Sequence, residues 1–402
     1  FEPLRFVPTR LKEYGVIDEK LDHERVWFVP KTKFGIDVSL EALEHEWGFN
    51  TVILALGAWR DRPLPLDGAE ELVGKGLVYQ NPLIYWFNHK HEASYEGAQF
   101  ETPDGAIVIG GGLASVDVAK VMMLETVTRA LRERGIEVDM VEMEHKGIDK
   151  TLAAHDLTYE SLDLKGATLF YRKRREDMPL VAIPPAADEK RIEKIHTSRA
   201  RLADKAQSKY LFKIEPLMSP ESLIVEDGNV TGVRFRRMEH RDGSFVKTDD
   251  LVERRGRVVV SSIGSIPEPL PGVPMKGELF DFEVLDAEKQ VVRLNGHPTV
   301  YAAGNAVTGK GNIAASRKHG TEIAGQVAAW LLGESDVMPV DPEHNRKNAE
   351  AVGEAVADEL AHATPLSNDE MSALRARVEG RWNEIGFDGN YSAWIESVGR
   401  AS

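Results

Sequence analysis

The stretch "AIVIGGGLASVDVAK", Ala106–Lys120, constrains the fold of this chain more than any other part of the sequence. Its apolar start is typical of a buried strand, three glycines follow, and the residues after them have the pattern of an amphipathic helix. A strand that turns directly into a helix brings unpaired backbone N–H groups and the positive end of the helix dipole to one point. α/β proteins hold the pyrophosphate of a dinucleotide in this way, so the stretch predicts a Rossmann-like unit.

The spacing of the small residues gives each of them a separate role. Gly110 permits the tight turn, Gly112 lets backbone amides approach a pyrophosphate without a Cβ in the way, and Ser115 lets the helix pack closely on the strand. Glycine turns of this kind also occur where they serve packing alone, and this is the second interpretation. Under the first interpretation, the residues that contact the nucleotide are Gly110, Gly111, Gly112, Leu113, Ala114 and Ser115.

The end of the next strand decides which dinucleotide is favoured. An acidic residue there would bind the ribose hydroxyls of NAD, whereas Arg or Lys would bind the 2′-phosphate of NADP. In "ATLFYRKRRE", Ala167–Glu176, the strand is followed by Arg172 and Lys173 and by two further arginines. This cluster predicts NADPH, with NADH less favoured, and the alternative is a basic strand end that contacts only solvent.

The two motifs lie unusually far apart along the chain. A compact βαβ unit takes roughly 30 residues, and Arg172 follows Gly110 at about twice that separation. The excess, about residues 134–164, predicts an insertion or an extended helix.

Length and composition exclude several classes of function. The chain has 402 residues, enough for two or three domains, and its net charge of −15 argues against nonspecific nucleic-acid binding. The sequence contains no cysteine, which excludes disulfides and Cys-ligated zinc or iron–sulfur centres, so any electrons must reside on other cofactors. It has no apolar run of about 18 residues and no signal-like start, which predicts a cytoplasmic protein without a transmembrane segment.

Strand and helix signals alternate along the chain in the manner of an α/β protein. Further strands are expected in Asn50–Ala58 and in "RVVVSSIGSIPE", which begins at Arg257. The segment His297–Gly333 has the pattern of a strand, a glycine-rich turn and a long helix, and the tail from residue 334 becomes helical in pattern without a chemical motif.

Four motifs together resemble a known family. "VILALGAWRDRPLPLDG", "AIVIGGGLASVDVAK", "ATLFYRKRREDMP" and "VYAAGNAVTGKGNIAASRKHG" are similar to motifs of the glutamate synthase small (β) subunit and its relatives, in the same order. These proteins belong to the FAD/NAD(P)-dependent pyridine nucleotide-disulfide oxidoreductase superfamily, and the resemblance covers about residues 1–333.

The resemblance implies an α/β fold with two Rossmann-like dinucleotide-binding domains, in which an FAD domain is interrupted by an NAD(P)H domain. The implied divisions are residues 1–100 for an incomplete first part of the FAD domain, 101–254 for the NAD(P)H domain, 255–333 for the second part of the FAD domain, and 334–402 for a helical C-terminal extension.

The resemblance also implies an FAD site in which the protein supplies position and electrostatics, without a catalytic side chain or a metal ion. Gly304 and Asn305 would approach the ribityl chain and pyrophosphate of FAD, and a helix capped by Asn312 would direct its dipole at the flavin. The full set of expected FAD-contacting residues is Gly57, Ala58, Gly264, Gly304, Asn305, Gly311, Asn312 and Ile313. His319 and Arg317, on the same helix, are expected at the surface or at a domain contact. The aromatic run Tyr85, Trp86 and Phe87 is expected in core packing or a hinge cluster, and the alternative is a cover over the cofactor crevice.

Three departures from the family pattern affect the expected function. Asn305 replaces the usual Asp, the cysteine-rich iron–sulfur segment has no counterpart, and no GxGxxG motif precedes residue 50. The chain alone is therefore expected to form half of an FAD site, which a partner chain or an upstream segment completes. The expected activity is hydride transfer from NADPH to FAD and on to an unidentified acceptor, which could be a partner protein. The alternative is a noncatalytic nucleotide-binding or assembly subunit that has lost flavin.

Overall fold

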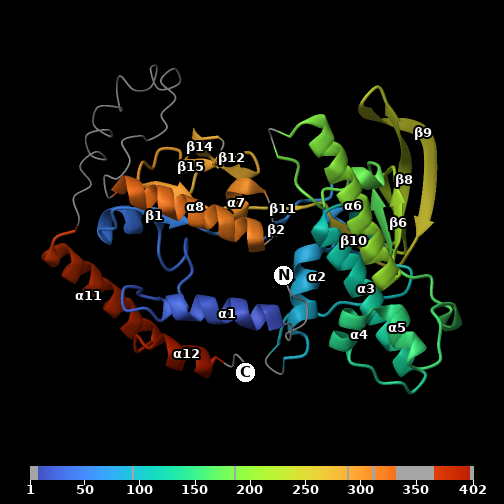
Figure 1. The fold of residues 1–402 in the computed structure, drawn as a ribbon, viewed down its shortest axis with the longest axis horizontal. Coiled ribbons are helices and arrows are strands. Elements are labelled where there is room, and N and C mark those ends of the chain that lie inside the picture. The colour runs from blue at the N-terminus through green and yellow to red at the C-terminus, as the bar shows by residue number, and fades with distance from the viewer. Residues whose placement is uncertain are drawn as a thin grey trace. The chain divides into compact units, whose positions relative to one another are not determined.

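The computed structural model describes residues 8–92, 95–184, 187–287, 289–309, 313–331 and 366–398. The chain forms two compact units (Figure 1). Asp61–Ser265 form one, called the inserted unit, and the segments Val7–Arg60 and Ile266–Ser402 on either side of it form the other, called the flanking unit. The chain passes between them through β2 (Arg60–Asp61) and β11 (Ser265–Ile266), which pair with each other.

The inserted unit is built on a five-stranded sheet in which every described pair of neighbours is parallel. The central strand β4 (Ile107–Gly110) is buried along its whole length, as its apolar sequence predicts. Parallel pairing brings the carboxyl ends of all strands to one edge of the sheet. In spatial order the strands are β3 (Leu77–Tyr79), β10 (Val259–Ser262), β4, β5 (Thr168–Tyr171) and β6 (Lys213–Pro216).

Helix α3 (Leu113–Arg132) follows β4 directly and buries Val118, Val121 and Leu124 in the core of the inserted unit. It ends at Arg132, and the residues after it form α4 (Met140–Lys146) and α5 (Ile148–Ala153), so the predicted insertion is present and α3 is not extended through it. The remaining helices of this unit are α2 (Gln80–His89) and α6 (Glu189–Tyr210), with short 3-10 turns at Glu70–Leu72, Glu160–Leu162 and Arg175–Asp177.

The insertion covers a charged residue on α3. The Lys120 side chain is 10% exposed, and its ammonium lies 2.8 Å from Glu144 of α4 and 3.1 Å from Asp117. A buried lysine without such partners would be strongly destabilising. The α4 helix therefore supplies a second carboxylate, Glu144, beside the Asp117 carboxylate that α3 itself provides.

A three-stranded antiparallel sheet lies in the same unit and was not predicted from the sequence. It consists of β7 (Met218–Glu226), β8 (Asn229–Arg241) and β9 (Ser244–Arg255), seen as long ribbons in Figure 1. Val233 and Phe235 of β8 are fully buried, and Phe235 stacks on Phe170 of β5 with ring centroids 4.3 Å apart. This contact fixes the sheet to the strand that carries the basic cluster.

The flanking unit contains a four-stranded sheet in the order β1 (Val52–Leu54), β16 (Val300–Ala302), β15 (Val291–Leu294) and β14 (Phe282–Asp286). β1 and β16 are parallel, whereas the other pairs are antiparallel. Helix α8 (Ile313–Leu331) packs Ile323 and Val327 into a buried cluster with Tyr301 of β16. The short elements are a π-helical turn at Ala42–Glu46, α7 (Asn305–Thr308), β12 (Met275–Lys276) and β13 (Leu279–Phe280).

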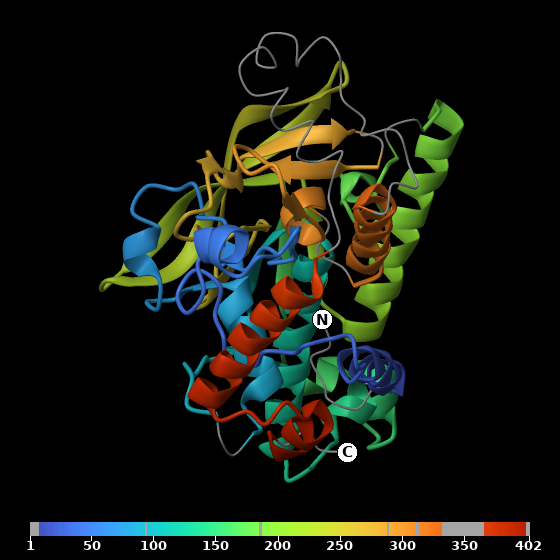
Figure 2. The same cartoon turned by 90° about the vertical axis from the view of Figure 1, so that its left-hand side faces the viewer.

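The predicted helical tail is present as α11 (Asn368–Ile385) and α12 (Tyr391–Ser397). A capping box of Ser367 and Glu370 starts α11, as the sequence "SNDE" favours. Figures 1 and 2 show α12 beside α1 (Pro8–Leu21), and the Tyr391 hydroxyl donates to Asp18 of α1 at 2.7 Å. The tail therefore packs within the flanking unit.

The unit boundaries differ from the expected divisions at residues 100 and 254. β3 and β10 both pair within the sheet of the inserted unit, so residues 61–100 and 255–265 belong to it. The sequence does not predict these boundaries, because the residues of a short apolar strand do not indicate which sheet the strand will join. Among the described residues, no helix is both long and apolar enough to cross a membrane.

Candidate functional site

The carboxyl edge of the sheet in the inserted unit brings together three of the predicted segments. Gly110 ends β4, Arg172 follows β5, and Gly264 follows β10 shortly after the strand ends. β4 is hydrogen-bonded to both of the other strands in parallel register, so the three loops lie on neighbouring strands. Ligands of open α/β sheets bind at this edge.

Two of the three glycines in the loop between β4 and α3 are required by packing. A Cβ at Gly110 would overlap the Ser115 hydroxyl and the backbone oxygen of Ser262, and one at Gly111 would overlap the ring of Tyr171. The fully buried Ser115 hydroxyl donates to the Ser262 carbonyl at 2.9 Å, which ties α3 to β10. Gly110 and Ser115 therefore allow the close helix–sheet contact that the sequence predicts.

Gly112 lies in a different environment. A Cβ there would have no heavy atom within 4 Å, and Gly112 is the N-cap of α3 without a side-chain cap. Leu113 and Ala114, which follow it, are exposed. Open space and uncapped amides at the start of a 20-residue helix fit a bound pyrophosphate, whose charge the helix dipole would favour.

The structure divides the basic cluster into two pairs. Arg174 forms an ion pair with Asp177 at 2.7 Å, and Arg175 forms one with Asp204 at 2.7 Å. Arg172 is exposed, and among the described residues neither Arg172 nor Lys173 forms an ion pair. The Lys173 ammonium lies over the ring of Phe245, 5.6 Å from its centroid. Arg172 and Lys173, the two residues predicted to bind the 2′-phosphate, are thus the two whose charges are not neutralised.

The sequence did not identify Tyr171 and Arg199 as residues that shape this edge. The Tyr171 hydroxyl donates to the Asp177 carbonyl at 3.1 Å, and burial raises the pKa of this phenol. Arg199 of α6 is 7% exposed and donates from two nitrogens to the Val181 carbonyl, at 2.6 and 2.8 Å. These contacts hold the chain that follows Arg172, and an aromatic residue directly before a basic cluster is the only sequence signal for them.

In the flanking unit, the parallel pair β1 and β16 places two predicted loops at one sheet edge. Gly57 and Ala58 follow β1, Gly304 and Asn305 follow β16, and the Ala303 amide donates to the Leu54 carbonyl at 2.9 Å. The Asn305 side chain is half-buried and makes no hydrogen bond to the described residues. A free amide at this position fits the hydroxyls of a ribityl chain, because it can both donate and accept.

His319 is buried, so of the two positions expected for it, at the surface or at a domain contact, the surface position is wrong. It is 6% exposed, and its Nδ1 accepts the Gly304 amide at 2.9 Å. His319 is one turn before the buried Ile323 on α8, which explains its inward position, whereas Arg317 is exposed. Of the other predicted residues, Gly311 and Asn312 lie outside the described part of the chain, and Ile313 is described only as the first residue of α8.

Gly264 belongs to the inserted unit and not to the second part of an FAD domain. Its φ of +114° requires glycine, and its carbonyl accepts the Arg62 amide at 3.0 Å. This bond joins the two segments through which the chain enters and leaves the inserted unit.

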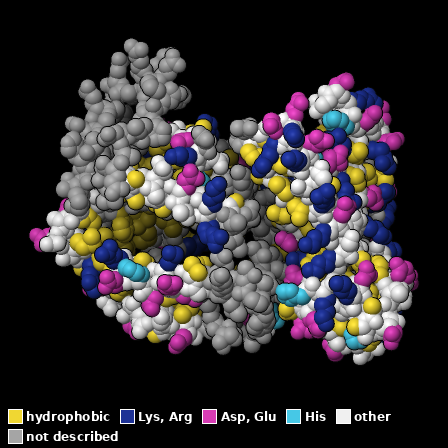
Figure 3. Space-filling view, viewed as in Figure 1, with side chains coloured by type: hydrophobic (Ala, Val, Ile, Leu, Met, Phe, Trp, Pro, Cys, Tyr) yellow, Lys and Arg dark blue, Asp and Glu magenta, His cyan; other side chains and the backbone are white. Residues whose placement is uncertain are grey.

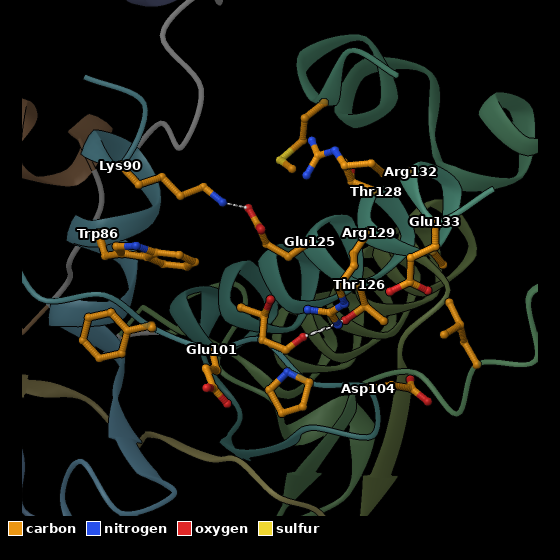
Figure 4. A pocket seen from close by; sticks show the side chains of 16 residues that line it. Trp86, Lys90, Glu101, Asp104, Glu125, Thr126, Thr128, Arg129, Arg132 and Glu133 are labelled. Atoms are coloured by element: carbon orange, nitrogen blue, oxygen red, sulfur yellow. Dashed lines mark hydrogen bonds and ion pairs between the residues drawn. The ribbon is translucent and has the colours of Figure 1, made fainter. Parts of the chain in front are cut away.

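A cavity of about 660 Å³ lies elsewhere in the inserted unit (Figure 4). The second half of α3 lines it with Glu125 and Arg129, and α2 lines it with Trp86. Lys90, the C-cap of α2, also lines it, and its ammonium is paired with Glu125. Gly112 is about 20 Å away at the other end of α3, from its rise of ~1.5 Å per residue, and none of the predicted site residues lines the cavity. Trp86 and Phe87 are buried, as expected for core packing, whereas Tyr85 is 59% exposed.

The chain is similar to known proteins in both sequence and structure. No family model matches the chain. It is 25% identical over 335 residues to the mitochondrial NADPH:adrenodoxin oxidoreductase of Arabidopsis thaliana, covering 77% of this chain and 64% of the relative. It is also 25% identical over 352 residues to the glutamate synthase [NADPH] small chain of Mycobacterium tuberculosis, covering 84% and 61%. The chain thus spans somewhat less than two thirds of these relatives.

Among solved structures, FprA of Mycobacterium tuberculosis in complex with NADPH has the same fold, with a TM-score of 0.58 and 17% sequence identity over 93% of this chain and 78% of that one. Two α/β units, each with glycine loops at the carboxyl ends of parallel strands, define a protein of the two-domain dinucleotide-binding class. Its sequence relatives, to which it is 25% identical, are members of the FAD/NAD(P)-dependent pyridine nucleotide-disulfide oxidoreductase superfamily.

Proposed function

We propose that this chain is part of a flavoprotein oxidoreductase that takes hydride from NADPH onto FAD and passes the electrons to a further acceptor. The observation that carries the proposal is the uncapped start of α3 at Gly112, on the same sheet edge as the unneutralised Arg172. Both sequence relatives described above are named for NADPH. The acceptor would be a partner protein, as in the relative named for adrenodoxin.

In this proposal the inserted unit binds NADPH. The amides after Gly112 hold the pyrophosphate, and Arg172 and Lys173 hold the 2′-phosphate. Arg174 and Arg175 position that segment through their ion pairs with Asp177 and Asp204. The nicotinamide supplies the hydride, so no side chain has to act as an acid, base or nucleophile.

The flanking unit would bind FAD through Gly57, Ala58, Gly304 and Asn305, and through the start of α8 at Ile313. We propose that this site is completed by a further strand, from another segment or a partner chain. β1 is at the end of its sheet, no described strand pairs with its outer edge, and its Ile53 is 40% exposed. Figure 3 shows hydrophobic side chains in a hollow where Figure 1 labels β1. An apolar edge of this kind favours the addition of a strand.

The phosphate assignment is tested by Arg172→Ala, with Arg174→Ala as a matched control. Loss of charge-assisted bonds worth ~1.5–3 kcal/mol should weaken NADPH binding by about 10- to 100-fold. NADH binding should change little, because NADH has no 2′-phosphate. Arg174→Ala should affect NADPH less, because its charge is already paired with Asp177. Titration calorimetry measures both nucleotides, and equal losses for both would contradict the assignment.

The second candidate function is a noncatalytic nucleotide-binding or assembly subunit, which Asn305 favours because an amide binds a ribityl hydroxyl without charge assistance. The visible spectrum of natively purified protein separates the two. A flavin band that bleaches when NADPH is added supports the oxidoreductase. NADPH binding by pure, folded protein without any flavin band supports the second function. A cytoplasmic location remains a prediction from the sequence.

A further inference from the structure

His319 connects three segments of the flanking unit. It lies on α8, its Nδ1 accepts the Gly304 amide at 2.9 Å, and its Nε2 lies 3.1 Å from the Gln290 carbonyl. Gly304 is the N-cap of α7, and Gln290 is the residue before β15. The imidazole is 6% exposed, so water does not compete for either bond.

The two partners determine the protonation state of the ring. A backbone amide can only donate, so Nδ1 must carry a lone pair and no proton. A carbonyl can only accept, so Nε2 must carry the proton. Only the neutral imidazole with its hydrogen on Nε2 satisfies both partners, because the imidazolium would direct an N–H at the Gly304 amide.

The bond to His319 acts on a turn that only glycine forms readily. Gly304 has φ +82° and ψ −148°, a region that residues with a Cβ avoid. Its carbonyl accepts the amide of Thr308 at 3.0 Å and the Thr308 hydroxyl at 3.1 Å. α7 therefore holds the carbonyl of Gly304, and His319 holds its amide.

We infer that His319 is a positioning residue for the Gly304 turn, which it holds in place as a neutral imidazole protonated on Nε2. This inference rests on the proposed function insofar as the turn contacts FAD. The Gly304 amide is already occupied, so Gly304 contributes close backbone approach rather than a hydrogen bond to the cofactor. The Asn305 side chain is then the polar group that this turn offers.

Three variants separate the two bonds of the imidazole. The side-chain amide of Asn can occupy the position of Nδ1, so His319→Asn should retain the bond to Gly304. The side-chain amide of Gln can occupy the position of Nε2, so His319→Gln should lose that bond. His319→Phe loses both bonds. Lys318→Asn, exposed on the same helix, is the matched control.

The first measurement needs no cofactor. Nitrogen NMR of histidine-labelled protein at neutral pH should show His319 protonated on Nε2 and not on Nδ1. Hydrogen exchange should be about 10-fold faster at the Gly304 amide in His319→Gln and His319→Phe, because a protecting bond is lost. It should be unchanged in His319→Asn and Lys318→Asn. A proton on Nδ1, or unchanged exchange in His319→Gln, would overturn the inference.

The second measurement is FAD affinity, taken on the protein as purified with any partner chain. Weakening by about 10-fold in His319→Gln, with near-normal affinity in His319→Asn, would extend the positioning role to the cofactor. Equal FAD affinity in all variants, with exchange at Gly304 altered, would overturn that role at the cofactor site. If the unmodified protein binds no FAD at all, the proposed function fails, while the NMR and exchange results still decide the local role of His319.

Discussion

Asp61 shows how burial changes the chemistry of a single side chain. Its carboxylate accepts the Asn81 amide at 3.2 and 3.3 Å. Burial raises the pKa of Asp61 from 3.8 to about 7, although the bond from the Asn81 amide works in the opposite direction. Between about pH 4 and pH 7 the folded protein therefore holds a proton on Asp61 that the unfolded chain has released. Nothing in the sequence "WRDRP" indicates this.

This shift predicts a dependence of stability on pH. Below about pH 4 both states hold the proton, and as the pH rises from about 4 to about 7 only the folded state does. The free energy of unfolding should therefore fall across this window. A three-unit shift corresponds to ~4 kcal/mol at most, and partial exposure reduces the expected loss to about 1–2 kcal/mol. Urea unfolding at pH 5 and pH 8 measures this loss.

The matched variants are Asp61→Asn, which should abolish this loss of stability, and Asp67→Asn at an exposed position, which should retain it. An unchanged pH dependence in Asp61→Asn would assign the effect to another group.

At the scale of elements, the loop between β4 and α3 separates packing from ligand binding. The sequence predicts the tight turn at Gly110 and the approach to a pyrophosphate at Gly112, but it does not show which of the three glycines packing requires. The division depends on neighbours from other strands, because Ser262 of β10 and Tyr171 of β5 occupy the space beside Gly110 and Gly111. Gly112 has no such neighbour.

Substitutions at Gly110 and Gly112 should therefore affect different properties, namely stability at Gly110 and NADPH binding at Gly112. Gly110→Ala should destabilise the inserted unit by about 2–3 kcal/mol, because its Cβ overlaps a backbone oxygen that cannot move freely. Gly112→Leu should change stability by less than about 1 kcal/mol and block NADPH binding. Thermal unfolding and nucleotide titration measure the two effects. Normal NADPH affinity in Gly112→Leu would count against this loop as the pyrophosphate site.

At the scale of the whole molecule, each of the two units has buried clusters of its own. Phe28 in the flanking unit contacts Tyr391 and Trp394 of the tail, with ring centroids 5.0 and 5.1 Å apart. The Trp382 indole donates to the Phe28 carbonyl at 2.9 Å. The tail is therefore held to the flanking unit by aromatic contacts with a segment far away in the sequence.

Phe28→Ala should release the tail and leave the inserted unit intact. Loss of these partly buried aromatic contacts should cost about 2–3 kcal/mol. Hydrogen exchange read by mass spectrometry should rise in α11 and α12 and stay unchanged in β4 and α3. Faster exchange spread evenly over both units would show that the chain unfolds as a single cooperative body.

Local patterns predicted the elements whose signals lie within one short segment. The strand–glycine–helix unit at Ala106–Lys120, the basic strand end and the helix over residues 369–385 are all found where the sequence indicated them. The antiparallel sheet β7–β9, the membership of β3 and β10, and the burial of His319 were not predicted. These features depend on pairing between distant segments, and hydrophobic periodicity within one segment does not predict such pairing.

The sequence by itself determined the α/β class, the order of the dinucleotide motifs and the chemical types of the candidate ligands, because glycine turns, apolar periodicity and charge act locally. Only the tertiary structure decided which arginines keep an unneutralised charge, which glycines face open space, and which tautomer His319 adopts. Each of these depends on atoms contributed by other strands and helices. Packing brings those atoms within a few ångströms, and at that distance sterics, ion pairing and desolvation determine what each side chain can do.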